Sequence, residues 1–160
     1  MPEDYFTGRI AQEYETRWPY LFEPAVVDPA VDFLTARAGT GPVLELGVGT
    51  GRIALPLSRR GLQVHGIELS PPVVAQLRSK PGAEAIGVTV GDFATVRVEG
   101  TFSLAYLVRN TIMNLTTQDE QVACSPTSPP IWSRAGASSW RSWSPNCAAS
   151  HPARRCTRSR

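Results

Sequence analysis

The stretch "PVLELGVGTGRIALPLSRRG", residues 42–61, determines the fold that we expect for this chain. Residues 43–46 form a short apolar run typical of a buried strand, and three glycines follow at every second position. Residues 52–60 then have the pattern of a helix, and Gly61 is a typical helix end. A strand, a glycine turn and a helix in direct succession indicate the first unit of a parallel α/β sheet.

The three glycines of the turn have different expected roles. Gly47 lets the chain leave the strand in a tight turn, Gly49 lets the backbone approach a ligand, and Gly51 lets the next helix start close to the sheet. The spacing G-x-G-x-G is one residue shorter than the dinucleotide-binding pattern G-x-G-x-x-G. Glu45, two residues before the first glycine, is unfavourable beside a pyrophosphate and suits a ligand with a positive amino group.

Two further acidic residues follow predicted strands. Glu68 ends the strand expected at residues 63–68, where a carboxylate can accept hydrogen bonds from both hydroxyls of a ribose. Asp92 follows the strand expected at residues 86–90 and suits an exocyclic amine, and Phe93 beside it suits packing on a flat ring.

The remaining segments indicate an α/β fold, a Rossmann-like doubly wound sheet whose first four strands are recognisable. Ser70 followed by Pro71 is a typical helix start, with the Ser70 side chain as the cap. We expect helices at residues 10–18, 25–38, 71–80 and from residue 117 onward, and a fourth strand at residues 102–108.

In this order, the glycine turn, Glu68 and the pair Asp92 and Phe93 resemble the class I S-adenosylmethionine-dependent methyltransferases. The resemblance covers residues 10 to about 124 and implies S-adenosyl-L-methionine as the cofactor. It implies that Glu45 and the three glycines lie around the amino acid part of the cofactor. Glu68 would then lie at its ribose, and Asp92 and Phe93 would lie at its adenine.

The segment "YLVRNTIMNLTTQDEQVAC", residues 106–124, resembles the fourth-strand motif and following helix of small-molecule methyltransferases. This implies that Val108, Arg109 and Asn110 lie beside the cofactor. Tyr14 resembles a tyrosine of the N-terminal helix that closes over the cofactor in the family. We therefore expect methyl transfer to a small-molecule acceptor. The catalytic base, if one is needed, and the acceptor atom are not identified by the sequence.

Composition favours a cytoplasmic protein with one domain. The chain has 160 residues, of which 42% are apolar and 19% charged, and its apolar runs are shorter than a membrane span. Its first residues do not resemble a secretory signal, and its three cysteines form no metal or disulfide pattern. We expect no metal site, no membrane partner and no nucleic-acid partner, and the sequence does not indicate an oligomeric state.

Other functions remain open from the residues alone. An NAD(P)-dependent oxidoreductase of Rossmann type also uses a strand, a glycine turn and a distal acid, although the glycine spacing and Glu45 favour the methyltransferase. A fragment that binds the cofactor without catalysis has the same motifs. The six arginines of residues 125–160 suggest nucleic-acid binding, but they form no recognisable repeat.

Residues 125–160 differ in composition from the methyltransferase-like domain expected at residues 1–124. They contain nine serines, five prolines and three of the four tryptophans, and they lack leucine and valine, so they are unsuited to the further strands of the family fold. With GC-rich codons and one base restored after the Cys124 codon, the neighbouring frame can encode "HLEPGGRLVMEVMV", a turn and an apolar strand. We expect residues 125–160 to be frameshift-derived or a disordered tail, and the 160-residue form to bind cofactor weakly and turn over little.

Sequencing the gene and its near relatives around the Cys124 codon tests this expectation. A shifted reading frame predicts a one-base difference at that codon in the relatives, followed by the apolar sequence given above. Relatives that encode the segment "SPTSPPIW" in frame would show instead that the tail is genuine.

Overall fold

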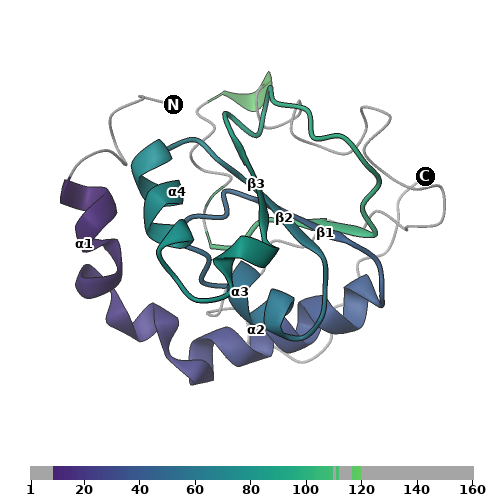
Figure 1. Ribbon diagram of the computed structural model, residues 1–160, viewed down its shortest axis with the longest axis horizontal. Helices are drawn as coiled ribbons and strands as arrows, with labels where there is room; N and C mark the ends of the chain where they lie inside the picture. Colours follow the sequence, from purple (N-terminus) through teal and green to yellow (C-terminus); the bar gives the residue numbers. More distant parts are fainter. Residues whose placement is uncertain (1–8, 110, 112–116, 120–160) are drawn as a thin grey trace.

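The computed structural model describes residues 9–109, 111 and 117–119 as a parallel four-stranded sheet with helices packed against it (Figure 1). The strand order is β3-β2-β1-β4, which confirms the expected Rossmann-like fold class. The elements in chain order are α1 (Arg9–Arg17), the 3-10 helix η1 (Pro19–Phe22), α2 (Pro24–Ala38), β1 (Val43–Leu46), α3 (Ala54–Arg59), β2 (Val64–Glu68), α4 (Pro71–Arg78), η2 (Ala83–Ala85), β3 (Gly87–Val90) and β4 (Leu104–Tyr106).

Strand β1 lies between β2 and β4 and is buried on both faces, which explains why three of its four residues are apolar. Val43 pairs with Val64 of β2 and with Leu104 of β4. Alternate side chains of β1 point to opposite faces, so Val43 packs in one apolar cluster and Leu44 in the other. By the same alternation, the charged residue Glu45 lies on the face of Val43.

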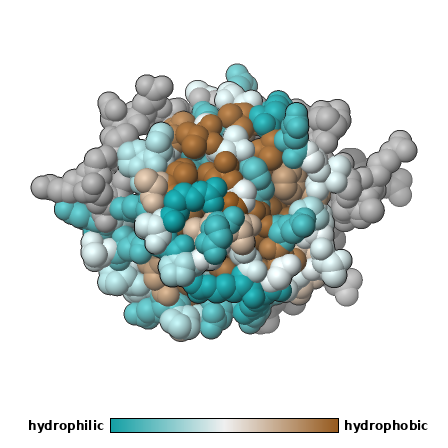
Figure 2. Space-filling model, in the orientation of Figure 1, coloured by the Kyte–Doolittle hydropathy of each residue, from teal (hydrophilic) through white to brown (hydrophobic). Residues whose placement is uncertain are grey.

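Helices α2, α3 and α4 contribute to the larger apolar cluster, on the face of the sheet that contains Val43. Val31 of α2 and Leu57 of α3 are fully buried there. On the other face, the segment between β3 and β4 covers Leu44 and Ile67 with side chains such as Phe102. In the space-filling view, hydrophobic side chains gather over the central part of the molecule and hydrophilic ones surround them (Figure 2). No helix in the described ranges is long and apolar enough to cross a membrane.

The structure differs from the predicted elements mainly at their ends. Helix α3 begins at Ala54 instead of residue 52. Arg52 lies in the turn, and its guanidinium donates a hydrogen bond to the Leu21 carbonyl, with Nη1 3.3 Å from that oxygen. Ser70 precedes α4 as expected, but its side chain makes no capping hydrogen bond. Strand β4 is shorter than the strand predicted at residues 102–108.

Some predicted features lie outside the described residues. These are Asn110, most of the helix expected from residue 117 onward, and the whole segment 125–160.

Gly51 and Gly49 form a matched pair for testing the turn. Both have a left-handed backbone, with φ of +83° and +57°, so alanine at either costs about 1–2 kcal/mol in backbone strain. A Cβ at Gly51 would lie 2.3 Å from Leu77 Cδ1, whereas a Cβ at Gly49 would have no atom within 4 Å. We expect Gly51→Ala to lower the free energy of unfolding in urea by about 1–3 kcal/mol more than Gly49→Ala. Equal losses would contradict the close packing of α4 on the turn.

Candidate functional site

A cavity lies at the carboxyl ends of β1, β2 and β4, beside the glycine turn. The chain runs from β1 through β2 to β3 on one side and then returns to place β4 on the other side of β1. The carboxyl end of β1 is therefore a topological switch point, where open α/β sheets bind ligands. The lining residues are Tyr14, Glu45, Gly47, Val48, Gly49, Thr50, Arg52, Glu68, Leu69, Val73, Phe93, Val108, Arg109 and Thr111.

Glu68 joins the glycine turn to the end of β2. Its Oε2 accepts a hydrogen bond from the Gly49 N–H, 3.0 Å away, and its Oε1 accepts one from the Ser70 N–H, 3.1 Å away. Burial raises the pKa of Glu68, and the backbone N–H donors partly oppose that rise. Because each carboxylate oxygen can accept more than one hydrogen bond, Glu68 can still accept from ligand hydroxyls in the cavity.

Glu45 is a buried carboxyl group, only 1% exposed, at the carboxyl end of β1. The Tyr106 hydroxyl donates a hydrogen bond of 2.9 Å to its Oε2. Burial raises the pKa of Glu45 to about 8; the Tyr106 hydrogen bond and the Arg52 charge oppose this rise, and the Glu68 charge adds to it. A carboxyl group with this pKa is largely protonated at neutral pH, and a cationic ligand group would favour its charged form.

Two guanidinium groups lie in the same cavity wall as the two carboxyl groups. Burial lowers the pKa of Arg52, the nearby Glu45 and Tyr14 oppose this, and Arg109 adds to it. Arg109 has a left-handed backbone with φ of 61°, which is uncommon for a residue with a side chain and is often found at functional positions. The cavity therefore combines positive and negative groups within a buried space.

Two buried polar atoms at the cavity lack a hydrogen-bond partner within the described part of the chain. They are Thr50 Oγ1 and Arg109 Nη1. An unpaired buried polar atom costs about 1–3 kcal/mol, and more when the group is charged. Both residues line the cavity. A ligand that accepts a hydrogen bond from Arg109 Nη1 and also forms a hydrogen bond with Thr50 Oγ1 would therefore remove this cost.

The N-terminal segment contributes one aromatic side chain, that of Tyr14, to the cavity lining. Tyr14 of α1 lines the cavity and packs against Trp18, with ring centroids 5.1 Å apart, and against Phe22, with ring centroids 6.4 Å apart. Tyr14 was expected above the cofactor from resemblance alone, and the structure places it at the cavity.

Apart from Tyr14, seven of the ten residues predicted to lie at the cofactor line the cavity. They are Glu45, Gly47, Gly49, Glu68, Phe93, Val108 and Arg109. Gly51 instead lies under α4, against Leu77. Asp92 is not among the lining residues, and its Oδ1 accepts a hydrogen bond of 2.9 Å from the Ala94 N–H. Its role at the adenine stays a prediction, and Asn110 lies outside the described residues.

Sequence reasoning missed several lining residues, mainly Thr50, Arg52, Leu69 and Val73. Arg52 was assigned to the helix, and the pattern gave no indication that its guanidinium turns back toward Leu21. Leu69 follows Glu68 directly, so its position beside a ribose-binding acid could have been inferred from the strand end, whereas Val73 lies in the first turn of α4.

The fold and the cavity together define a Rossmann-like domain with a polar ligand site at its switch point. Residues 43–125 match the family described as "Methyltransferase domain", and the chain belongs to this family. This confirms the expected class, the class I S-adenosylmethionine-dependent methyltransferases, and S-adenosylmethionine as the cofactor of that class.

Solved structures with the same fold are methyltransferases. The CcbJ methyltransferase from Streptomyces caelestis is 34% identical, with a TM-score of 0.71 over 85% of this chain and 56% of that one. The glycopeptide N-methyltransferase MtfA, solved with S-adenosyl-L-methionine, is 25% identical, with a TM-score of 0.54 over 60% of this chain and 45% of that one.

Relatives found by sequence differ in what they methylate. A cypemycin N-terminal methyltransferase from a Streptomyces species is 31% identical over 81 residues, which is 51% of this chain and 33% of that protein. An rRNA adenine N-6-methyltransferase from Corynebacterium diphtheriae is 24% identical over 98 residues, 61% of this chain and 37% of that protein. The chain thus spans little more than a third of the length of these two relatives, and they do not settle the type of acceptor.

The raised pKa of Glu45 predicts a pH-dependent stability. Between its ordinary value of 4.5 and its folded value of about 8, the folded protein retains a proton that the unfolded chain releases. The free energy of unfolding should therefore fall as the pH rises through this window. Glu45→Gln cannot ionise and retains an oxygen that can accept from Tyr106, so urea unfolding between about pH 5 and about pH 8 should show a smaller fall. An identical fall in both proteins would contradict the assignment.

Proposed function

We propose that this chain binds S-adenosylmethionine in the described cavity and that its methyltransferase domain, when complete, transfers the methyl group to a small-molecule acceptor; the 160-residue form itself is expected to bind weakly and turn over little. The observation that supports this most directly is the pair of carboxyl groups, the buried Glu45 and the partly buried Glu68, at the ends of adjacent strands beside the glycine turn. One suits an ammonium group and the other suits ribose hydroxyls, and S-adenosylmethionine contains both.

The charges of the cavity match those of an amino acid moiety. In this proposal Glu45 binds the α-amino group, and Arg109, whose Nη1 is buried and unpaired in the described structure, binds the α-carboxylate. Glu68 binds the ribose, with the Gly49 and Ser70 N–H groups fixing its orientation. Phe93 lines the cavity and supplies an aromatic face for the adenine ring.

Methyl transfer from a sulfonium is an in-line displacement by the acceptor. The bond from sulfur to the methyl carbon breaks as the bond from the acceptor to that carbon forms, and the electron pair returns to sulfur. The sulfonium charge already activates the leaving group, so the protein contributes mainly by orienting the two partners and excluding water. Tyr14 on one side of the cavity and Val108 on another are placed for that role.

The charge distribution favours a small-molecule acceptor over RNA. Residues 1–124 have 14 acidic and 10 basic side chains, whereas proteins that bind nucleic acid present basic surfaces to the phosphates. The similarity to a glycopeptide N-methyltransferase is compatible with this choice. The cytoplasmic location expected from the sequence stays a prediction.

We also propose that residues 1–124 are the methyltransferase domain and that residues 125–160 derive from a shifted reading frame. The family match ends at residue 125, where the composition changes, and this coincidence supports the boundary.

Calorimetry with two ligands tests the assignments of Glu45 and Glu68. S-adenosylhomocysteine contains adenine, ribose and the amino acid, whereas 5′-methylthioadenosine lacks the amino acid. We expect Glu68→Gln to weaken both ligands by roughly 1–3 kcal/mol, because both contain the ribose. Glu45→Gln should weaken only S-adenosylhomocysteine. Glu84→Gln, a change at an exposed carboxylate outside the cavity, serves as the matched control.

Proton release gives a second measurement in the same titrations. Because burial raises the pKa of Glu45 to about 8, an ammonium group bound against it should displace its proton near neutral pH. Titrations in buffers of different ionisation enthalpy should show this release with S-adenosylhomocysteine and not with 5′-methylthioadenosine or with Glu45→Gln. No binding of S-adenosylhomocysteine, or equal effects of all three variants, would contradict the proposed site.

A further inference from the structure

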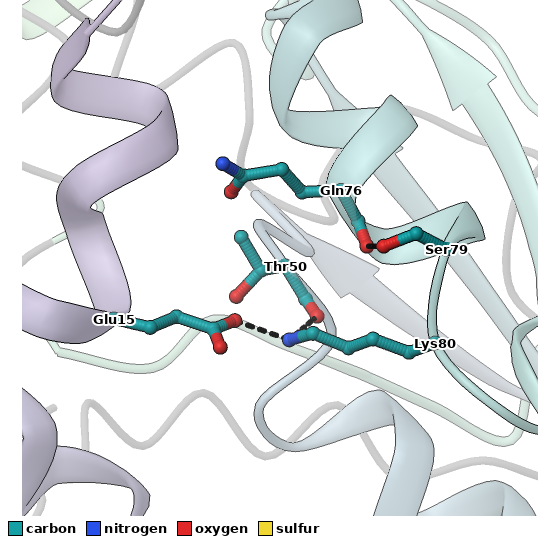
Figure 3. Close-up of polar contacts among 5 residues, drawn as sticks. All are labelled: Glu15, Thr50, Gln76, Ser79 and Lys80. Atoms are coloured by element: carbon teal, nitrogen blue, oxygen red, sulfur yellow. Dashed lines mark hydrogen bonds and ion pairs between the residues drawn. The ribbon is translucent and has the colours of Figure 1, made fainter.

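Lys80, just after α4, contacts the glycine turn and α1, two segments that each contribute a residue to the cavity lining, without lining the cavity itself (Figure 3). Its Nζ donates a hydrogen bond of 2.7 Å to the carbonyl oxygen of Thr50, in the glycine turn. The same Nζ forms an ion pair with the carboxylate of Glu15, on α1. It also lies 5.6 Å from the ring centre of Phe22. One ammonium group thus connects the N-terminal helix to the glycine turn.

The end of α4 fixes the place from which Lys80 reaches these partners. The Ser79 hydroxyl donates a hydrogen bond of 2.7 Å to the Gln76 carbonyl (Figure 3). The Lys80 N–H donates one of 3.1 Å to the Leu77 carbonyl. Both bonds close the last turn of α4. Because Leu77 is fully buried against Gly51, the backbone beside Lys80 is fixed relative to the turn.

Helix α1 depends on such contacts for its position. It has nine residues, fewer than an isolated helix needs to be stable in water. It packs against α4 and η1, and it brings Tyr14 to the cavity. Glu15 follows Tyr14 directly, so the ion pair with Lys80 acts on the turn of α1 that contributes to the cavity wall.

We propose that Lys80 is a positioning residue, which keeps α1 closed over the cofactor cavity through the bridge from Glu15 to the Thr50 carbonyl. The Lys80 and Glu15 side chains are 24% and 38% exposed, so water screens this pair less than it would a fully exposed pair. An ammonium that donates to a carbonyl and to a carboxylate satisfies two acceptors on separate elements. The bridge thereby couples closure of α1 to the conformation of the glycine turn.

Amide hydrogen exchange of the 160-residue chain tests the bridge without any ligand. We expect Lys80→Met to accelerate exchange in α1 by roughly tenfold while the amides of β1 keep their protection. Lys80→Arg, which can donate to both partners, should restore protection of α1. Arg60→Met is the matched control, since it removes a surface ion pair to Asp32 with a 2.5 Å contact outside the cavity. Glu15→Gln removes the other partner of the ion pair and should accelerate amide exchange in α1 alone. This variant tests the bridge if Lys80→Met does not fold.

A second arm measures cofactor affinity and rests on the proposed function. Lys80→Met should weaken S-adenosylhomocysteine by roughly tenfold and Lys80→Arg by much less, although Lys80 does not line the cavity. Unchanged exchange in α1, or equal acceleration of α1 and β1, would overturn the bridge. If the unaltered chain failed to bind S-adenosylhomocysteine, the proposed function would fail, and the exchange of α1 would still decide the role of Lys80.

Discussion

The candidate site depends on one carboxylate that accepts two backbone hydrogen bonds. Glu68 ends β2 and accepts from the N–H groups of Gly49 and Ser70, so it connects the turn after β1 to the loop before α4. These hydrogen bonds stabilise the charged carboxylate and compensate part of the cost of burying it. They therefore lower the pKa of Glu68 and oppose the rise that burial causes. The turn, the cavity and the start of α4 are thereby fixed by the same group that we assign to the ribose.

The same cavity shows what a polar site costs a small domain. Glu45 is buried and has a pKa of about 8, Arg109 has a strained backbone, and the hydroxyl of Thr50 is unpaired in the described structure. Each of these features reduces the stability of the protein in the absence of a ligand. A ligand of matching charge forms the missing interactions with the polar groups and so recovers part of that free energy on binding. The polar groups therefore lower the stability of the ligand-free protein and make ligand binding selective.

The fold and half of the site follow from local patterns, whereas the rest depends on contacts between distant segments. The apolar run at residues 43–46, the glycine spacing and the acid at the end of β2 are local features, and the structure places them as the sequence indicates. Arg52 contacts the carbonyl of Leu21, and Lys80 contacts Glu15; no periodicity of the chain predicts such pairs. Helix α3 has only six residues, and it begins two positions after the start that the pattern predicts.

The hydrogen bond from Tyr106 to Glu45 joins two residues that face each other across β1 and β4, in the pairing of Glu45 with Tyr106. A slip of β4 by one residue would move the hydroxyl to the other face of the sheet and leave a buried carboxyl group without its donor. The hydrogen bond in the binding site therefore forms only when β4, the last described strand, pairs with β1 in this register. During synthesis the chain must emerge beyond β4 before Glu45 acquires its partner, so a ribosome-bound chain cannot complete the site before Tyr106 has left the ribosome.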